Sequence, residues 1–414
     1  MSAFFRKSAA FALAAAALSH GCAAAVLQDL PPVLAEIDRR AREEFWDPKL
    51  KGVDWTAEVA RAAGELARAE TPIERDRVYD RLLSELEDSH TFRMPAGRWP
   101  ARNWGTAGLR IGRDGEGYAV KGVIPGGPAD RAGMKTGDSI LAAGGKDYGK
   151  ERVNFRDLFL VLEGAPGSLL EVTWRPLKSG EAARTVRLEL APEEPGDALV
   201  WKSARVIRRG GKLYGYARLW GVSAETALAV VDMLLDREET ARTHPALAGW
   251  GEIEGFLLDA RGNSGGYDPN ILATFLRGRW SAGDYYVRSR GAKRLVPPVS
   301  RPISVALLLN SATASAGEAL ALKFRAHAIG PVVGEITAGM ASGGAAAFSL
   351  SDGSTLWITR RAIEDAEGRS YEGRGVSPDI LVADRPAAAP GEEEAIVEAG
   401  LKALAGPGGG HVPR

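Results

Sequence analysis

The chain has 414 residues, and its 53 lysines and arginines balance its 53 aspartates and glutamates. This length exceeds one ordinary hydrophobic core, so we expect two or three domains. The net charge of zero argues against a nucleic-acid-binding protein, which needs a basic surface to neutralise phosphates. The hydrophobic content of 45% is that of a soluble globular protein.

Residues 1–25 have the pattern of a secretory signal peptide. A basic pair precedes an alanine-rich apolar core at residues 8–18, which is too short for a permanent transmembrane helix. Cys22, the only cysteine, follows in a stretch that resembles a bacterial lipoprotein processing site, while residues 23–25 equally suit ordinary signal peptidase. We expect a protein of the bacterial cell envelope, periplasmic or secreted, and membrane anchoring through a lipidated Cys22 stays open.

Residues 26–100 are predicted to form an N-terminal helical segment of three helices, because apolar residues recur at helical spacing. Asp54 is expected to cap the second helix, and residues 71–74 have the spacing of a capping box at the start of the third. The apolar face of the third helix is expected to contain Ile73, Val78, Leu82 and Leu86. The pair Ser89–His90 follows directly after this helix.

Residues 101–191 change to short apolar strands separated by glycine-rich turns. This region resembles a bacterial PDZ domain. The resemblance implies that backbone N–H groups of one loop bind the terminal carboxylate of a peptide, and that the adjoining strand edge pairs with that peptide. The loop residues concerned are Gly108, Leu109, Arg110 and Ile111. A small β-barrel without a ligand is the alternative.

A linker is predicted at residues 191–198, and strands and helices then alternate over residues 198–385. Such alternation favours a layered α/β domain. A hairpin at residues 348–360 is expected within this domain. Residues 386–414 are predicted to contain a C-terminal helix and a disordered tail.

Ser315 lies where an apolar strand at residues 305–309 turns into an amphipathic helix. A hydroxyl at such a corner is held rigidly, and the free N–H groups and positive dipole end of the helix face its target. These are the requirements of an acyl-transfer nucleophile. Alternatively, Ser311, Thr313 and Ser315 simply cap the helix.

A second serine, Ser264, lies in residues 262–266, whose G-x-S-x-G pattern formally fits a nucleophile elbow. The residues that separate it from the preceding strand argue against that role. The glycines favour a loop whose N–H groups stabilise an oxyanion. Asp259 and Arg261 are expected to brace this loop.

Three linked motifs, at residues 257–266, 310–320 and 371–379, follow the helical segment and the PDZ-like region. In this order they resemble the C-terminal processing and tricorn-like serine peptidases. The resemblance implies a multidomain α/β protein with a layered α/β peptidase core of the ClpP/crotonase type.

By the same resemblance, Ser315 is the nucleophile, and the N–H groups of Ala316 and Gly265 form the oxyanion hole. The Ser/Lys branch of the family carries a lysine where this chain has Met340, which cannot accept a proton. The tricorn-like branch uses a serine-histidine pair ahead of the PDZ domain and a glutamate in an EG-x-GV-x-PD stretch.

This second pattern matches Ser89, His90 and Glu372. The resemblance therefore implies that His90 is the general base and that Glu372 and Ser89 orient it. The function implied is a secreted or envelope-anchored serine endopeptidase that cleaves extended or unfolded polypeptides through an acyl-enzyme, with substrate capture by the PDZ domain.

No metal or nucleotide motif occurs, so we expect catalysis without a cofactor and without nucleic acid. The alternative is a catalytically inactive protein of the same fold that binds peptides or apolar ligands. A third hypothesis is hydrolysis of small esters or amides by an elbow at Ser264.

Overall fold

The computed structural model describes residues 30–97, 105–150, 158, 162–177, 180–266, 270, 272, 286–289, 292–295, 303–387 and 393–406. The predicted signal peptide and Cys22 lie outside these residues. The chain divides into two compact units, one of Met1–Ala101 with Ser342–Ile363 and one of Arg102–Ala341 with Glu364–Arg414. None of the helices within the described ranges is long and apolar enough to cross a bilayer.

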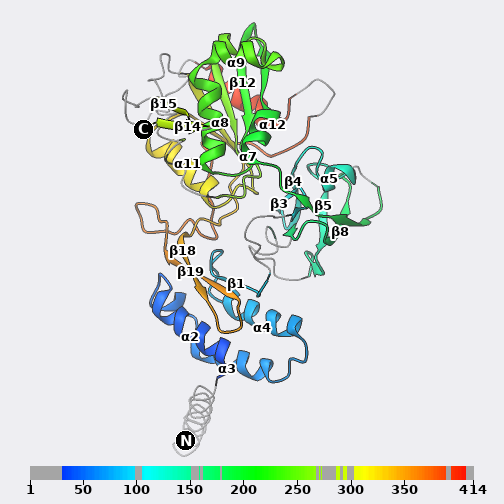
Figure 1. The fold of residues 1–414 in the computed structure, drawn as a ribbon, viewed down its shortest axis with the longest axis vertical. Helices are drawn as coiled ribbons and strands as arrows, with labels where there is room; N and C mark the ends of the chain where they lie inside the picture. The colour runs from blue at the N-terminus through cyan, green and yellow to red at the C-terminus, as the bar shows by residue number, and fades with distance from the viewer. Residues whose placement is uncertain are drawn as a thin grey trace, which may run out of the picture. The chain divides into compact units, whose positions relative to one another are not determined.

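The first unit combines three helices with a three-stranded antiparallel sheet of order β1-β19-β18 (Figure 1). Its elements are α2 Pro32–Glu44, α3 Trp55–Leu66, α4 Pro72–Ser84, β1 Phe92–Met94, β18 Gly343–Ser349 and β19 Thr355–Arg361, with a short turn of helix, η1, at Leu50–Gly52. The predicted caps are confirmed: Asp54 accepts a hydrogen bond from the Ala57 N–H, and Thr71 and Glu74 form a reciprocal capping box.

The predicted apolar face of α4 is wrong at one position. Val78, Leu82 and Leu86 are buried, but Ile73 is 66% exposed. Val78 comes five positions after Ile73, which places the two side chains about 140° apart around a helix of 3.6 residues per turn. Tyr79 is buried beside Val78 instead.

The hairpin of β18 and β19 belongs to the first unit, whereas the sequence places it in the α/β core. Trp357 of β19 pairs in register with Phe92 of β1. Leu356 and Ile358 pack into the same buried cluster as the helices α2 to α4. The pairing of β19 with β1 joins segments that are far apart in the sequence, and the local pattern of a hairpin does not reveal it.

The second unit begins with an antiparallel sheet in which β3, β4, β5, β8 and β9 lie in that order, with β6 beside β5. The elements are β2 Gly105–Thr106, β3 Leu109–Asp114, β4 Gly117–Val123, α5 Pro128–Arg131, β5 Ser139–Ala143, β6 Lys146–Asp147, β7 Glu163–Gly164, β8 Leu169–Arg175, β9 Arg184–Glu189 and β10 Ala191–Pro192. Strand β3 lies at the edge of the sheet, as the PDZ resemblance requires. The predicted linker is partly structured, because β10 pairs with β2 and α7 begins at Gly196.

The rest of the second unit is a six-stranded sheet of order β11-β12-β13-β16-β17-β20, parallel from β12 onward. Its elements are α7 Gly196–Ser203, β11 Arg205–Arg209, β12 Lys212–Arg218, α8 Ala224–Leu235, α9 Arg237–Thr243, η3 Pro245–Leu247, η4 Trp250–Glu252, β13 Gly255–Asp259, β16 Ser304–Leu309, α11 Ala316–Ala326, β17 Val332–Gly334, β20 Ile380–Leu381 and α12 Ala395–Ala405. A separate hairpin joins β14 Tyr286–Ser289 to β15 Ala292–Leu295.

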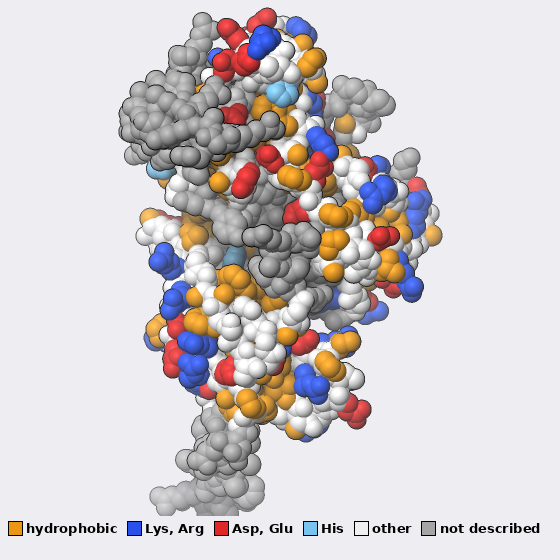
Figure 2. Space-filling model, viewed as in Figure 1, with side chains coloured by type: hydrophobic (Ala, Val, Ile, Leu, Met, Phe, Trp, Pro, Cys, Tyr) orange, Lys and Arg blue, Asp and Glu red, His pale blue; other side chains and the backbone are white. Residues whose placement is uncertain are grey.

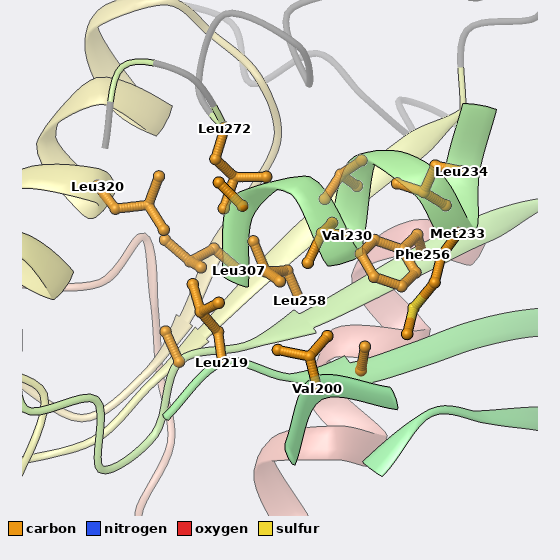
Figure 3. Packing of buried hydrophobic residues seen from close by; sticks show 14 of the residues in the cluster. Val200, Leu219, Val230, Met233, Leu234, Phe256, Leu258, Leu272, Leu307 and Leu320 are labelled. Carbon is orange, nitrogen blue, oxygen red and sulfur yellow. The ribbon is translucent and has the colours of Figure 1, made fainter. Parts of the chain in front are cut away.

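Helices cover both faces of this parallel sheet. Leu258 of β13 and Leu307 of β16 pack in one cluster with Val230 of α8, which Figure 3 shows. The intervening Leu257 packs with Leu401 of α12 in a second cluster. Successive strand residues face opposite sides of a sheet, so these continuous apolar strands are buried on both sides. The predicted layered α/β core is confirmed.

Charged side chains of both signs are intermixed on the face shown in Figure 2. Exposed pairs such as Arg39–Glu43, with 2.9 Å between nitrogen and oxygen, contribute little to stability in water. This distribution is what a net charge of zero predicts, and no large field of one sign is visible on that face.

Candidate active site

The site lies at one edge of the parallel sheet in the second unit. Strands β13 and β16 are neighbours, so their carboxyl ends meet at the same edge, where α/β sheets place their ligand-binding loops. The loops that follow are bonded to each other: Thr313 Oγ1 donates to the Ala260 carbonyl at 2.8 Å, and the Ala314 N–H donates to the Asn263 carbonyl at 2.8 Å. The two predicted motifs are therefore brought together.

Ser315 ends the turn that joins β16 to α11 and has a φ of 52° and a ψ of −118°. Positive φ is costly for a residue with a Cβ and accumulates at functional sites. Its N–H donates to the Met340 carbonyl at 3.1 Å and to Glu318 Oε2 at 3.0 Å. The serine predicted from the sequence thus sits on a strained, firmly held strand-to-helix corner.

Gly265 lies directly beside the nucleophile. A Cβ built on Gly265, whose φ is +96°, would come within 2.5 Å of the Ser315 Cβ and 3.2 Å of the Ala316 nitrogen. Only glycine fits this close approach without a shift. The structure therefore brings Gly265 and Ala316 to Ser315, as the oxyanion-hole prediction requires.

The donor role of Gly265 stays a prediction, because its N–H is engaged. It donates to Asn263 Oδ1 at 2.9 Å, and the amide of Asn263 is itself fixed through a donation to the Leu219 carbonyl at 2.7 Å. The next glycine, Gly266, belongs to the same loop and forms a parallel β-bridge with Val222. Gly266 is a second candidate donor.

A buried ionic network braces the glycine-rich loop, as the sequence predicts for Asp259 and Arg261. The Arg261 guanidinium bonds to Asp259 at 2.7 Å and to Asp384 at 2.8 Å, and Tyr216 Oη donates to Asp259 at 2.6 Å. Burial by itself would raise the pKa of Asp259, but the nearby Arg261 and Arg218 charges and its hydrogen bonds lower it to about 2. The Asp259 carboxylate is therefore ionised at neutral pH and pairs with Arg261.

Glu318 is a residue of the site that the sequence analysis missed. Its fully buried carboxylate accepts hydrogen bonds from the N–H groups of Ser315, Gly339 and Met340 and from Thr337 Oγ1. Burial raises the pKa of Glu318 to about 7, although these bonds act in the opposite direction. An acidic residue three positions after a serine at a helix start has capping-box spacing, which could have indicated it.

Glu372 lies on a turn that is bonded to the same segment. The Gly373 N–H donates to the Gly339 carbonyl at 2.7 Å, and the Val376 N–H donates to Thr337 Oγ1 at 2.7 Å. The Glu372 side chain is half-buried. Glu318 accepts hydrogen bonds from Thr337 and Gly339 as well as from the Ser315 N–H. The turn that contains Glu372 and the turn that contains Ser315 are therefore both anchored to residues 337–339.

His90 lies in the first unit, where two hydroxyl groups meet its Nδ1. Ser89 Oγ is 2.8 Å away and Ser342 Oγ is 2.9 Å away. A neutral imidazole that donates from Nδ1 to these oxygens carries its lone pair on Nε2, which is the tautomer a general base needs. Burial lowers the pKa of His90, and the charge of Asp88 opposes this shift. The sequence analysis did not identify Ser342.

The site residues predicted from the family therefore fall into two groups. Ser315, Ala316, Gly265 and Glu372 belong to the second unit, and Ser89 and His90 belong to the first. Proton transfer between His90 and Ser315 stays a prediction. In the described part of the chain, no group of three His, Cys, Asp or Glu side chains could hold a metal ion.

The predicted peptide-binding loop of the PDZ-like region is largely buried. Leu109, Arg110 and Ile111 are each at most 4% exposed, and the Gly108 N–H already donates to Thr106 Oγ1 at 3.0 Å. Further along β3, the Arg113 carbonyl accepts a hydrogen bond of 2.6 Å from Ser311 Oγ, next to the nucleophile turn. Part of the strand edge expected to bind peptide thus contacts the peptidase core.

Ser264 lies in the loop after β13 and is not the last residue before a helix. Its N–H donates to the Trp220 carbonyl at 3.2 Å, and Gly265 and Gly266 follow it. An elbow nucleophile sits on a sharp strand-to-helix turn, which is the position of Ser315. The geometry favours Ser315 over Ser264.

Residues 214–382 match the model of peptidase family S41, and residues 120–176 match that of the PDZ domain. The tricorn protease homolog 1 of Streptomyces coelicolor is 27% identical over 368 residues, which cover 85% of this chain and 33% of that protein. The chloroplastic carboxyl-terminal-processing peptidase 2 of Arabidopsis thaliana is 29% identical over 338 residues, covering 76% of this chain and 61% of that one.

The fold is similar to that of the photosystem II D1 C-terminal processing protease. The TM-score is 0.56 at 22% sequence identity, and the match covers 91% of this chain and 97% of that chain. The present chain spans about a third of the length of its Streptomyces relative. The family models thus locate a peptidase region and a PDZ region in the sequence, and the solved structure shows the same fold.

Proposed function

Because this chain carries a peptidase family S41 domain over residues 214–382 and a PDZ domain over residues 120–176, we propose that it is a serine peptidase that cleaves polypeptides through an acyl-enzyme. One observation carries the proposal: the positive φ of Ser315 at a strand-to-helix turn, with Gly265 and the helix N-terminus beside it. Such an arrangement suits nucleophilic attack on a carbonyl carbon whose oxygen becomes negative.

In the proposed reaction, Ser315 Oγ attacks the scissile carbonyl carbon while His90 Nε2 takes the hydroxyl proton. The Ala316 N–H and an N–H of the glycine-rich loop stabilise the oxyanion. His90 then returns the proton to the leaving amine as the C–N bond breaks, and an acyl ester of Ser315 remains. Water then attacks the ester carbonyl while His90 takes its proton, and His90 returns this proton to Ser315 Oγ as the acyl–oxygen bond breaks and the acid product leaves. Ser89 and Ser342 fix the imidazole tautomer, and Glu372 polarises this relay.

The proposed substrates are extended or unfolded polypeptides, some of them captured by the PDZ domain. The position of β3 at a sheet edge supports this part of the proposal, because an extended peptide can add a strand to the part of that edge that does not contact the peptidase core. The proposed location is the bacterial cell envelope or secretion, supported by the signal-like residues 1–25. Anchoring through a lipidated Cys22 belongs to the same proposal.

The pH dependence of kcat/KM tests the identity of the base. A histidine must be neutral to accept a proton, and burial lowers the pKa of His90 below its usual value of about 6.5. We therefore expect kcat/KM for an unstructured peptide to be constant near neutral pH and to fall only in acid, with a midpoint below about 6.5. An activity that rises through an alkaline midpoint, as for a lysine base, would rule His90 out.

A protein that binds peptides or apolar ligands without cleaving them is the competing proposal. It is favoured by Met340, which stands where the Ser/Lys branch has its base and which is bonded through its carbonyl to the Ser315 N–H. The same peptide experiment separates the two proposals, since a binding protein gives no turnover at any pH.

A further inference from the structure

A cluster of polar side chains lies around His90 in the first unit. It contains Asp88 and Ser89, which precede His90, and Ser342 and Thr359, which come more than two hundred positions later. The proposed reaction uses the two serines to fix the imidazole, but it assigns no role to Asp88. This carboxylate is the acidic member of the cluster.

The Asp88 carboxylate is buried, and one of its oxygens is held firmly. Oδ1 accepts hydrogen bonds from the His90 N–H at 3.1 Å, from Thr91 Oγ1 at 3.0 Å and from Thr359 Oγ1 at 2.5 Å. The other oxygen, Oδ2, is buried without a hydrogen-bond partner among the described residues. A buried carboxylate with an unsatisfied oxygen is costly, so its presence beside the proposed base calls for a functional explanation.

Ser342 connects this carboxylate to the imidazole. Its Oγ lies 2.9 Å from His90 Nδ1 and 3.5 Å from Asp88 Oδ1. A carboxylate accepts hydrogen bonds and donates none, so the Ser342 hydroxyl donates to Asp88, and its oxygen accepts from the imidazole. The 3.5 Å contact is long, as catalytic hydrogen bonds often are before the substrate binds.

The direction of these hydrogen bonds fixes the tautomer of His90. Because the Ser342 oxygen accepts, Nδ1 carries the proton, and Nε2 keeps the lone pair that takes the proton of Ser315. Burial lowers the pKa of His90, and the charge of Asp88 opposes this shift. The same charge stabilises the imidazolium that forms when His90 accepts a proton.

Among the described residues, Asp88 is the charged group that acts on the pKa of His90. The buried cation of β1, Arg93, pairs with Asp76 and Asp352 instead. The other charged side chains of α4 and β19 are at least partly exposed, and they include Arg77, Asp80, Arg81, Arg360 and Arg361. Solvent screens such charges, whereas the charge of Asp88 is buried.

We propose that Asp88, acting through Ser342, is a positioning residue for the general base His90. The carboxylate orients the Ser342 hydroxyl, the hydroxyl oxygen holds the Nδ1 proton, and the buried negative charge stabilises the imidazolium. This role rests on the proposed function, although the arrangement itself lies within the first unit. It adds an acid to the Ser89 and Glu372 that the family resemblance implies.

The variants D88N and S342A test the proposal in the full chain, through kcat and KM for an unstructured peptide. Asparagine keeps an oxygen that can accept the hydrogen bonds of Oδ1 but carries no charge, so the turn should remain folded. We expect each variant to lower kcat about tenfold, the effect of one charged hydrogen bond, and to change KM little. The double variant should lose little more than D88N alone, because both changes break one relay.

The pH profile separates a positioning role from a purely structural one. D88N removes the charge that opposes the effect of burial, so the acid midpoint of kcat/KM should move to lower pH. The matched control E87Q removes the adjacent, exposed carboxylate and should leave kcat and the midpoint unchanged. An unchanged midpoint in D88N, even with reduced stability, would overturn the proposal, as would full kcat in S342A.

Histidine NMR tests the same relay without requiring turnover. In the full chain with isotope-labelled histidine, the His90 signal is the one missing from H90Q. The unaltered imidazole should carry its proton on Nδ1, D88N should lower its pKa, and S342A should raise the share protonated at Nε2.

The two kinds of measurement separate the positioning role from the proposed function. The expected NMR changes in a chain that cleaves nothing would support the positioning role and remove the peptidase function. An active enzyme whose His90 signal shows an Nε2 proton, or does not respond to D88N, would keep the peptidase function and overturn the role of Asp88.

Discussion

Replacement of Ser315 by alanine is expected to lower cleavage of an unfolded polypeptide by at least about a thousandfold, because the acyl-enzyme can no longer form. The fold should survive, since the backbone contacts of Ser315 with Glu318 and Met340 do not involve its hydroxyl. The measurement is the initial rate of cleavage in purified preparations, with circular dichroism as the check on folding.

The informative comparison is Ser264→Ala. We expect this variant to keep far more activity than Ser315→Ala, because Ser264 does not occupy the strand-to-helix corner. A severe loss from Ser264→Ala with retained activity in Ser315→Ala would assign the nucleophile to the glycine-rich loop.

Replacement of Arg261 by methionine is expected to destabilise the second unit by about 3–5 kcal/mol. The change leaves the carboxylates of Asp259 and Asp384 buried without their cation, although methionine fills much of the same volume. Urea denaturation, followed by tryptophan fluorescence, should show a large shift of the midpoint. Activity at low denaturant should fall as well, because the network holds the loop of Gly265.

The pH dependence of that destabilisation follows from Asp259. Its pKa is about 2 in the folded chain against 3.8 ordinarily, so its stabilisation is complete above pH 3.8 and disappears as the pH falls toward 2. The difference between wild type and Arg261→Met should shrink over that range. Arg242→Met, an exposed change on α9, should shift the midpoint little, and an equal effect of the two changes would contradict the buried network.

Local features of the fold could be predicted from the sequence because they depend on neighbours in the chain. The caps at Asp54 and Thr71 need only a few adjacent residues. The partner of β19 could not be predicted, because β1 lies more than two hundred positions away and the hairpin pattern fits either unit. The exposure of Ile73 was not predicted, because the five-position spacing from Ile73 to Val78 does not keep both side chains on one face of a helix.

The residues of the candidate site also fall into two groups, those that a local sequence motif indicates and those that only the folded structure brings together. Ser315 and the loop of Gly265 could be predicted because each follows a buried strand with a recognisable motif. Glu318 and Ser342 were missed, since their roles depend on contacts made in three dimensions, with Met340 in one case and His90 in the other. The hydrogen bond from Gly265 to Asn263 was equally invisible in the sequence.

The central claim is that His90 activates Ser315, and covalent labelling by a fluorophosphonate tests it most directly. Wild type, Ser315→Ala, His90→Ala and the control His327→Ala are labelled side by side at neutral pH, and the rates are compared. The account predicts rapid labelling of wild type and of His327→Ala, none of Ser315→Ala, and a loss of at least about a hundredfold in His90→Ala. Undiminished labelling of His90→Ala would contradict it.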